Sequence, residues 1–360
     1  MSDDSTLRRH RDAIDALDLE ILARLSERAR HAQAIGRLKE GSGGPAYRPE
    51  REAQVLARLA KANGGPLAGE AVACVFREIM SACRALERAL TIAYLGPQGT
   101  FTHAAVLQHF GSSVVALPQA TIDDVFRAAE SGRADYAVVP VENSTECAVG
   151  RTLDLMVSTD LSVIGEVKLR VRQNLLSKAS TIHAVTKIYS HAQSFAQCVQ
   201  WLASHLPSVP RIVAASNAEA ARLASDEPGA AAIAGDIAAA TYAIPVLASH
   251  IEDEPNNTTR FWVLGRQSVG ASGHDQTSIV LSAPNRPGAV HELLGPLARH
   301  AVSMTRFESR PARTGSWEYL FYIDVSGHRD DPPVAAALDE LRRAAPYLKL
   351  LGSYPVAREP

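Results

Sequence analysis

The sequence predicts a multidomain protein in which an all-α domain, a two-lobed α/β domain and an α+β ferredoxin-like domain follow one another. Three observations predict this order. Residues 7–40 carry one apolar stripe at helical spacing, short apolar runs alternate with helix-like segments after residue 92, and a βαββαβ order begins near residue 277. At 360 residues, the chain is long enough for two or three domains with cores of their own. We expect the domains to span residues 1–91, 92–267 and 277–355.

Composition limits the classes of partner. A hydrophobic content of 46% with 21% charged residues is typical of a soluble globular protein. The formal net charge of -2 gives no electrostatic footprint for nucleic acid or for an acidic membrane surface. The acidic start at residues 1–6 argues against a signal peptide, and the alanine-rich run at 229–249 is interrupted by polar residues and a proline. We therefore expect a cytoplasmic protein.

The cysteines show neither the spacing of a zinc site nor that of a disulfide framework. They are Cys74, Cys83, Cys147 and Cys198. Buried free thiols are the expectation, and the sequence predicts no metal and no organic cofactor.

A long first helix is predicted over residues 7–40, followed by helices over 49–62 and 69–90. The apolar positions of the first helix are Ile14, Leu17, Ile21, Leu25, Ala32 and Ile35. A helix of this length spans roughly 50 Å, which is more than a 90-residue domain can cover alone. The stripe therefore predicts a partner chain, in a homodimer or a higher homo-oligomer.

The cations on the first two helices are the informative residues of this part of the chain. Arg28 and Lys39 share one face three turns apart, and Arg11 is rotated by roughly 100° from Arg28, which leaves it free to serve the other protomer's site. With Arg51 and Glu52 on the second helix, the pattern resembles the all-helical chorismate mutase family. For any one of these residues, a solvated charge on a helix surface is the alternative.

The resemblance implies roles in a rearrangement that needs neither proton transfer nor a covalent intermediate. The three arginines would clamp the two carboxylates, Lys39 would donate to the ether oxygen, and Glu87, protonated when it acts, would supply a second donor. Arg48 and Cys83 stand where other mutases carry an aspartate and a serine. The predicted mutase positions are Arg11, Arg28, Lys39, Arg48, Arg51, Glu52, Cys83 and Glu87.

From residue 92, the alternation of strand and helix signals predicts an α/β domain with mainly parallel strands. The strand candidates are 92–95, 114–117, 136–140, 161–169, 187–190, 211–215, 230–234 and 260–264. The polar motif of the last strand belongs to the same set as the motifs in the first third of the domain, so the chain has to return to that part. We therefore expect two lobes joined by crossing segments, with a site in the cleft.

Polar segments at strand ends carry the site motifs. They are residues 94–103, 139–144, 190–193 and 256–261. Together they resemble the prephenate dehydratase family over about residues 92 to 267, and the flanking domains resemble its partners in bifunctional bacterial P-proteins. Residues 96–100 could be mistaken for a phosphate loop, but they lack the lysine of that motif.

The resemblance implies that Thr259 donates the proton to the leaving hydroxyl of prephenate. Glu142, Asn143 and Ser144 would orient the substrate and support Thr259. Thr100, Ser190 and Gln193 would add hydrogen bonds. Arg260 would neutralise a carboxylate or hold the loop, and Phe261 would pack beside the ring or in the core. His191 is either structural or a base.

After a predicted linker at 266–276, the βαββαβ order is that of the ferredoxin-like plan. It resembles an ACT domain, and two of its segments look like those by which P-proteins bind phenylalanine. Gly288 would open a helix whose N–H groups receive the effector carboxylate, and Glu308 would face its ammonium group. The predicted effector positions are Asn285, Gly288, Ala289, Val290, Glu308, Ser309 and Arg310.

The sequence therefore predicts a bifunctional enzyme that takes chorismate through prephenate to phenylpyruvate and is inhibited by phenylalanine. The alternative from another class is a catalytically silent ligand-binding protein, with a two-lobed receptor and an ACT sensor.

Overall fold

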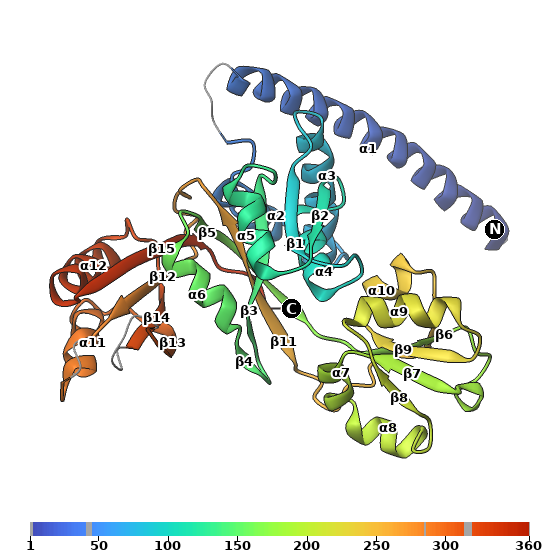
Figure 1. Cartoon of the computed structure of the whole chain (residues 1–360). Coiled ribbons are helices and arrows are strands. Elements are labelled where there is room, and N and C mark those ends of the chain that lie inside the picture. The colour runs from blue at the N-terminus through green and yellow to red at the C-terminus, as the bar shows by residue number, and fades with distance from the viewer. Residues whose placement is uncertain (1–2, 41–44, 284–285, 313–318, 360) are drawn as a thin grey trace. The chain divides into compact units, whose positions relative to one another are not determined.

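The structure, a computed structural model, describes residues 3–40, 45–283, 286–312 and 319–359 (Figure 1). It divides into two compact units. The first comprises residues 1–48, 56–90 and 110–114, and the second comprises 49–55, 91–109 and 115–360. Among the described residues, no helix combines the length and the apolar content that a membrane crossing requires.

The first unit is built from long helices, as predicted. They are α1 (Asp3–Glu40), α3 (Gly69–Ala85) and part of α2 (Pro49–Ala62). Much of the α1 stripe is open to solvent within this chain, since Ile14, Leu17 and Ile21 are 56%, 55% and 55% exposed.

The predicted end of the third helix at residue 90 is wrong. The helix ends at Ala85, and the N–H of Glu87 bonds the carbonyl of Arg84 at 2.9 Å in the turn that follows. The chain has to leave the helix here because strand β1 begins at Thr91. Glu87 therefore follows the helix that carries Cys83, and does not share its regular face.

The first lobe of the second unit holds a six-stranded sheet with the order β2-β1-β3-β11-β5, and β4 pairs with β3. Its strands are β1 (Thr91–Leu95), β2 (Val115–Gln119), β3 (Tyr136–Asn143), β4 (Cys147–Ala148), β5 (Ser162–Arg170) and β11 (Thr258–Gly265). Its helices are α4 (Phe101–Phe110), α5 (Ile122–Glu130) and α6 (Gly150–Ser158).

The second lobe holds a five-stranded sheet with the order β10-β6-β9-β7-β8. Its strands are β6 (Asn174–Ser177), β7 (Lys187–Ser190), β8 (Arg211–Val213), β9 (Ala230–Ala234) and β10 (Val246–Ala248). Its helices are η1 (Ile182–Ala184), α7 (Ala192–Ala196), α8 (Val199–His205), α9 (Asn217–Asp226) and α10 (Asp236–Thr241).

The two lobes and the crossing segments confirm the predicted architecture, but the prediction of mainly parallel strands is wrong. The chain leaves the first sheet after β5, builds the second sheet, and returns along β11, which lies antiparallel between β3 and β5 (Figure 1). In the second sheet, β6 is antiparallel to β9 and to β10. The returning strand therefore begins where β3 ends, so Thr259 pairs with Asn143.

The last part of the chain has the predicted βαββαβ order, and its sheet runs β13-β14-β12-β15 with antiparallel pairs throughout. Its elements are β12 (Asp275–Ser282), α11 (Ala289–Arg299), β13 (Met304–Pro311), β14 (Tyr319–Ser326), α12 (Pro332–Ala344) and β15 (Tyr347–Pro355). The predicted linker ends early, because β12 already begins at Asp275.

This last sheet packs on both faces. Ile279 and Leu281 pack against α11 and α12, whereas Val280, between them, joins a core with Trp262 of β11 and Leu153 of α6. Successive strand residues face opposite sides, so one strand serves both cores. The ferredoxin-like sheet is thereby joined to the sheet that carries the predicted site.

Candidate active sites

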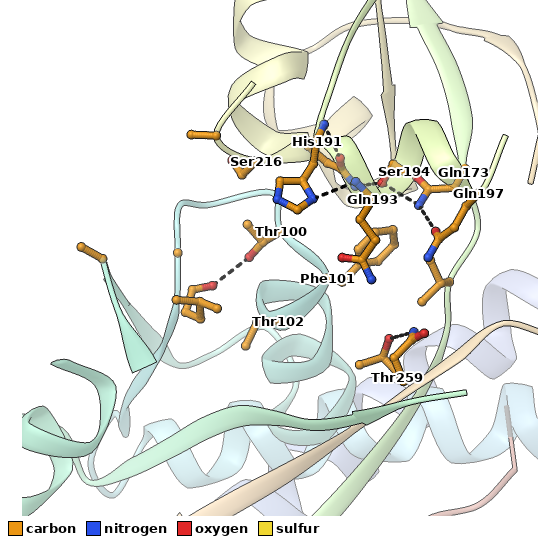
Figure 2. A pocket seen from close by; sticks show the side chains of 17 residues that line it. Thr100, Phe101, Thr102, Gln173, His191, Gln193, Ser194, Gln197, Ser216 and Thr259 are labelled. Atoms are coloured by element: carbon orange, nitrogen blue, oxygen red, sulfur yellow. Dashed lines mark hydrogen bonds between the residues drawn. The ribbon is translucent and has the colours of Figure 1, made fainter. Parts of the chain in front are cut away.

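A pocket of about 310 Å³ lies between the two lobes of the second unit. The first lobe contributes Thr100, Asn143 and Thr259 to its lining, and the second lobe contributes His191 and Gln193. Figure 2 shows Thr100 and Thr259 on one side of this space and Gln193 extending into it from the other side. The structure therefore brings together Thr100, Asn143, Gln193 and Thr259, which all come from predicted motifs.

Thr259 and Asn143 form the most specific contact in the pocket. The Nδ2 of Asn143 donates to Thr259 Oγ1 at 2.9 Å and to Asn257 Oδ1 at 2.8 Å. The Oδ1 of Asn143 accepts from the backbone N–H and the hydroxyl of Thr145, at 3.0 and 2.7 Å. These bonds fix the orientation of the amide, so Thr259 Oγ1 must accept from it. The Thr259 hydrogen has no acceptor among the described residues and is available to a ligand.

The pocket offers little positive charge to an anion, because His191 is the one lining residue that can carry it. Two helices begin at its wall instead. Thr100 precedes α4 and accepts from the N–H of His103 at 3.3 Å, and Ser216 caps α9 by accepting from the N–H of Glu219 at 3.0 Å. Helix N-termini present unpaired N–H groups and a partial positive charge, which suits carboxylates.

His103 holds the loop before α4 in place. Burial lowers the pKa of His103, so its ring stays neutral and Nδ1 accepts from the N–H of Gly99 at 3.2 Å. The ring stacks on Tyr94, with centroids 5.0 Å apart, and burial followed by the charge of Tyr242 raises the pKa of Tyr94 to about 12. Both aromatic residues are therefore uncharged near neutral pH, and their part in the site is structural.

Gln173 is a pocket residue that the sequence reading missed. Its Nε2 donates to Ser194 Oγ and to Gln197 Oε1, each at 3.0 Å, and the residue is 1% exposed. Its Oε1 has no partner among the described residues. An unpaired buried acceptor is costly unless a ligand satisfies it. The signal was weak, since Gln173 precedes the four-residue strand β6, which the apolar pattern did not reveal.

Glu142 and Arg260 were predicted for the site, but the structure does not bring them into the pocket. Each is the strand neighbour of a pocket residue and therefore points to the opposite face of the sheet. There, Glu142 Oε2 lies 2.8 Å from Arg306 Nε. Arg260 bonds Glu166 at 2.7 Å and Asp324 at 2.6 Å.

Three other predicted residues lie beside the pocket without lining it. Phe261 is 1% exposed and belongs to the core. Ser144 accepts from the N–H of Thr258 at 3.0 Å, which fixes the start of β11. Ser190 is fully buried and donates to the carbonyl of Ile233 at 3.1 Å. His191 lines the pocket, but its Nδ1 accepts from the N–H of Gln193 at 3.4 Å and caps α7, which favours its structural role.

In the first unit, the structure brings together two of the predicted mutase residues. Lys39 Nζ lies 3.8 Å from Glu87 Oε2. Gly36 makes room for this pair, because a Cβ at that position would meet Glu87 Cγ at 2.6 Å. Cys83 is 7% exposed, and Arg28 is partly buried. Arg11, Arg48 and Arg51 are exposed, Glu52 is partly buried, and Arg51 and Glu52 are counted with the second unit.

The predicted effector segments lie in the last sheet and its first helix. Gly288 directly precedes α11 with a φ of 80°, which favours glycine, and Ala289 is 5% exposed. Val290 lies in the first turn of that helix. Asn285 lies outside the described residues.

On β13, the side chains of Glu308 and Ser309 face opposite sides of the strand. Arg310 forms an ion pair with Asp154 of α6 at 3.2 Å, which is a contact with the first lobe.

Three family models match consecutive parts of the chain. They are chorismate mutase type II over residues 10–88, prephenate dehydratase over 92–269 and the ACT domain over 277–343. The bifunctional chorismate mutase/prephenate dehydratase of Neisseria gonorrhoeae is 54% identical over 98% of both chains.

Two solved structures resemble about three quarters of the chain. The prephenate dehydratase of Arthrobacter aurescens in complex with L-Phe has a TM-score of 0.68 at 34% identity, covering 74% of this chain and 90% of its own. The structure of GqqA, described as a novel type of quorum quenching acylase, has a TM-score of 0.68 at 30% identity, covering 74% of this chain and 98% of its own. Relatives with different named activities share this fold, so the fold alone does not determine the reaction.

Proposed function

The chain belongs to the bifunctional chorismate mutase/prephenate dehydratase family, and from this premise we propose how its two sites act in succession. The first site rearranges chorismate to prephenate. The second removes carbon dioxide and the ring hydroxyl of prephenate, which yields phenylpyruvate. Neither reaction, as balanced, consumes a cofactor.

We assign the first reaction to the surroundings of Lys39 and Glu87. In the rearrangement, a carbon–carbon bond forms as the ether C–O bond breaks, and negative charge grows on the ether oxygen. Two donors at that oxygen stabilise the charge, while a fixed geometry holds the folded substrate. Lys39 and Glu87, whose Nζ and Oε2 lie 3.8 Å apart, would be these donors. Within the first unit, Arg11 and Arg28 would hold the carboxylates, and Arg48 and Cys83 would complete the wall.

For the second reaction, we assign the proton donor to Thr259. The electrons of the C–carboxylate bond enter the ring, the C–O bond to the hydroxyl breaks, and the hydroxyl leaves as water with the Thr259 proton. The Asn143 N–H, 2.9 Å from Thr259 Oγ1, then stabilises the charge left on that oxygen until solvent returns the proton. This hydrogen bond is the observation that carries the proposal.

The pocket lining suits this substrate class. Carboxylates would be held by the N-termini of α4 and α9 and by neutral donors, which bind an anion less tightly than a buried arginine does. A loosely held ring carboxylate is free to leave as carbon dioxide. The ring hydroxyl is the one donor on the prephenate dianion, and the unpaired Oε1 of Gln173 would accept its hydrogen.

The regulatory ligand and the assembly are also proposals. The Arthrobacter aurescens relative was solved with L-Phe, and phenylalanine is the effector that we assign to the start of α11 at Gly288, Ala289 and Val290 and to one face of β13. The exposed stripe of α1, which includes Ile14 and Ile21, supports a homodimer. We propose that this dimer acts in the cytoplasm. Sedimentation equilibrium measures the assembly directly, and a monomer at micromolar concentration would contradict it.

Substituting Thr259 tests the proton donor. Thr259→Val preserves the shape but removes the hydroxyl, so kcat on prephenate should fall by roughly 10²–10⁴-fold. Thr259→Ser should keep most of the rate. The measurement is steady-state phenylpyruvate formation, with the mutase rate of the same protein as the control for folding. A valine variant with the wild-type kcat would exclude Thr259 as the donor.

A further inference from the structure

Two residue pairs stand side by side where β3 ends and β11 begins. Asn143 pairs with Thr259, and Glu142 pairs with Arg260. The first pair faces the pocket, and the second faces the sheet of the ACT domain. Residues that contact Glu142 and Arg260 therefore fix both strands one residue away from Asn143 and from Thr259, the proposed proton donor.

Arg260 is a fixed anchor on the ACT side. Its guanidinium bonds Glu166 of β5 at 2.7 Å, Asp324 of β14 at 2.6 Å and the hydroxyl of Tyr354 of β15 at 3.0 Å. Burial works to lower the pKa of Arg260, but Tyr354, Asp324 and Glu166 outweigh it, so the pKa is raised. Arg260 is therefore charged and held by ion pairs and hydrogen bonds on several sides.

Arg306 is held much less completely. Its side chain is 8% exposed, and Nε lies 2.8 Å from Glu142 Oε2. Its guanidinium N–H groups have no aligned hydrogen-bond acceptor among the described residues. A buried guanidinium with one poorly aligned counter-charge gains less than a bidentate pair and is more easily displaced.

The place of Arg306 in the chain connects this pair to the effector segment. Arg306 lies on β13, on the same side of the strand as Glu308 and Arg310. Arg310 pairs with Asp154 at 3.2 Å. The strand that carries the proposed effector residues thus contacts the dehydratase lobe through two ion pairs, one of them directly behind Asn143.

We propose that Arg306 is a positioning residue for the dehydratase reaction and the contact through which the effector segment acts on it. By holding Glu142 beside Arg260, Arg306 fixes the end of β3 and keeps the Asn143 amide on Thr259 Oγ1. A displacement of β13 by the effector releases Glu142 and loosens that amide. The inference rests on the proposed function of the pocket and adds the route of its regulation.

The test compares Arg306→Met, Arg306→Lys, Glu142→Gln and the Glu142→Gln/Arg306→Met double variant in the full chain. Arg306→Met should lower kcat on prephenate by about tenfold, leave KM nearly unchanged and weaken phenylalanine inhibition by a similar factor. Arg306→Lys, which keeps the charge, should retain most of the wild-type kcat and most of the phenylalanine inhibition. Glu142→Gln should match Arg306→Met, and the double variant should be no worse than either single variant.

Controls separate this contact from a general loss of structure. The mutase rate of each variant should equal that of the wild type. Arg342→Met, which removes an exposed arginine from α12, should change neither activity. Wild-type turnover of prephenate tests the proposed function itself. If the wild type is active and Arg306→Met retains its kcat and its inhibition, or if the double variant loses activity additively, the inference is wrong.

Discussion

At the scale of single residues, the dehydratase site depends on which atoms are already satisfied. Asn143 uses both ends of its amide within the protein, so Thr259 Oγ1 accepts one hydrogen bond and keeps its hydrogen for the ligand. Gln173 differs from Thr259, because its Nε2 already donates a hydrogen bond within the protein while its Oε1 accepts none. The Thr259 hydroxyl therefore offers a hydrogen to a ligand in the pocket, and Gln173 Oε1 can accept a hydrogen bond from it.

Gly36 has a comparable part in the first unit, since it leaves room for Glu87 beside Lys39. Gly36→Ala would place a Cβ 2.6 Å from Glu87 Cγ, so the Glu87 side chain must shift from its position beside Lys39. We expect the mutase kcat to fall by on the order of 10²-fold, because a small misplacement of a catalytic group has an effect of that size. The rate of chorismate consumption measures it.

The dehydratase rate of the same variant should stay at the wild-type level. Gly64→Ala is the matched control, because a Cβ at Gly64 meets nothing within 4 Å. A Gly36→Ala variant with normal mutase activity would show that the position of Glu87 does not matter for the rearrangement.

At the scale of elements, the sequence did not reveal the direction of the strands or the face of the sheet to which each side chain points. The apolar runs predicted β1, β7, β9 and β11, but an alternating pattern is the same in parallel and antiparallel strands. The direction of β11 follows from the return of the chain out of the second lobe. The short strands β4, β6 and β10 have two to four residues and carry too little pattern to be found.

The same reasoning explains which site residues were predicted. Asn143 and Thr259 belong to recognisable motifs and reach the pocket, whereas Glu142 and Arg260 belong to the same motifs and face away. Consecutive residues of a strand cannot all line one pocket, so alternation alone could have separated these pairs. Gln173 follows no motif, and only its burial and its unpaired acceptor identify it.

The helices α11 and α12 are joined by a charged contact with a defined pH dependence. Glu340 of α12 accepts from Arg299 at 2.5 Å and contacts His300 Nε2 at 2.8 Å. The bond from Arg299, followed by that from His300, lowers the pKa of Glu340 from 4.5 to about 2. The folded-state pKa thus lies below the unfolded one, so this stabilisation is present above pH 4.5 and is lost as the pH falls toward 2.

Glu340→Gln should therefore lower the urea midpoint of the full chain near neutral pH, and the difference from the wild type should shrink as the pH is lowered below 4.5. Urea unfolding followed by circular dichroism at several pH values measures this. A difference that stays constant over that range would show that the carboxylate charge does not contribute.

At the scale of the whole molecule, the two reactions are assigned to separate units. Lys39 and Glu87 lie in the first unit, and Asn143 and Thr259 lie in the second. The Neisseria gonorrhoeae relative matches over nearly the full length, so the domains occur together and in one order. The similarity to GqqA shows that the shared fold alone does not set the reaction. On our proposal, two separate sites act one after the other on the same small dianion.

The most direct test of this claim is a nuclear magnetic resonance time course that starts from chorismate, with the wild-type chain and with Thr259→Val. The wild type should form prephenate transiently and phenylpyruvate as the final product. The variant should consume chorismate at the wild-type rate and accumulate prephenate in equal amount. Phenylpyruvate from the variant at the wild-type rate, or a loss of chorismate consumption in a folded variant, would contradict two separate sites.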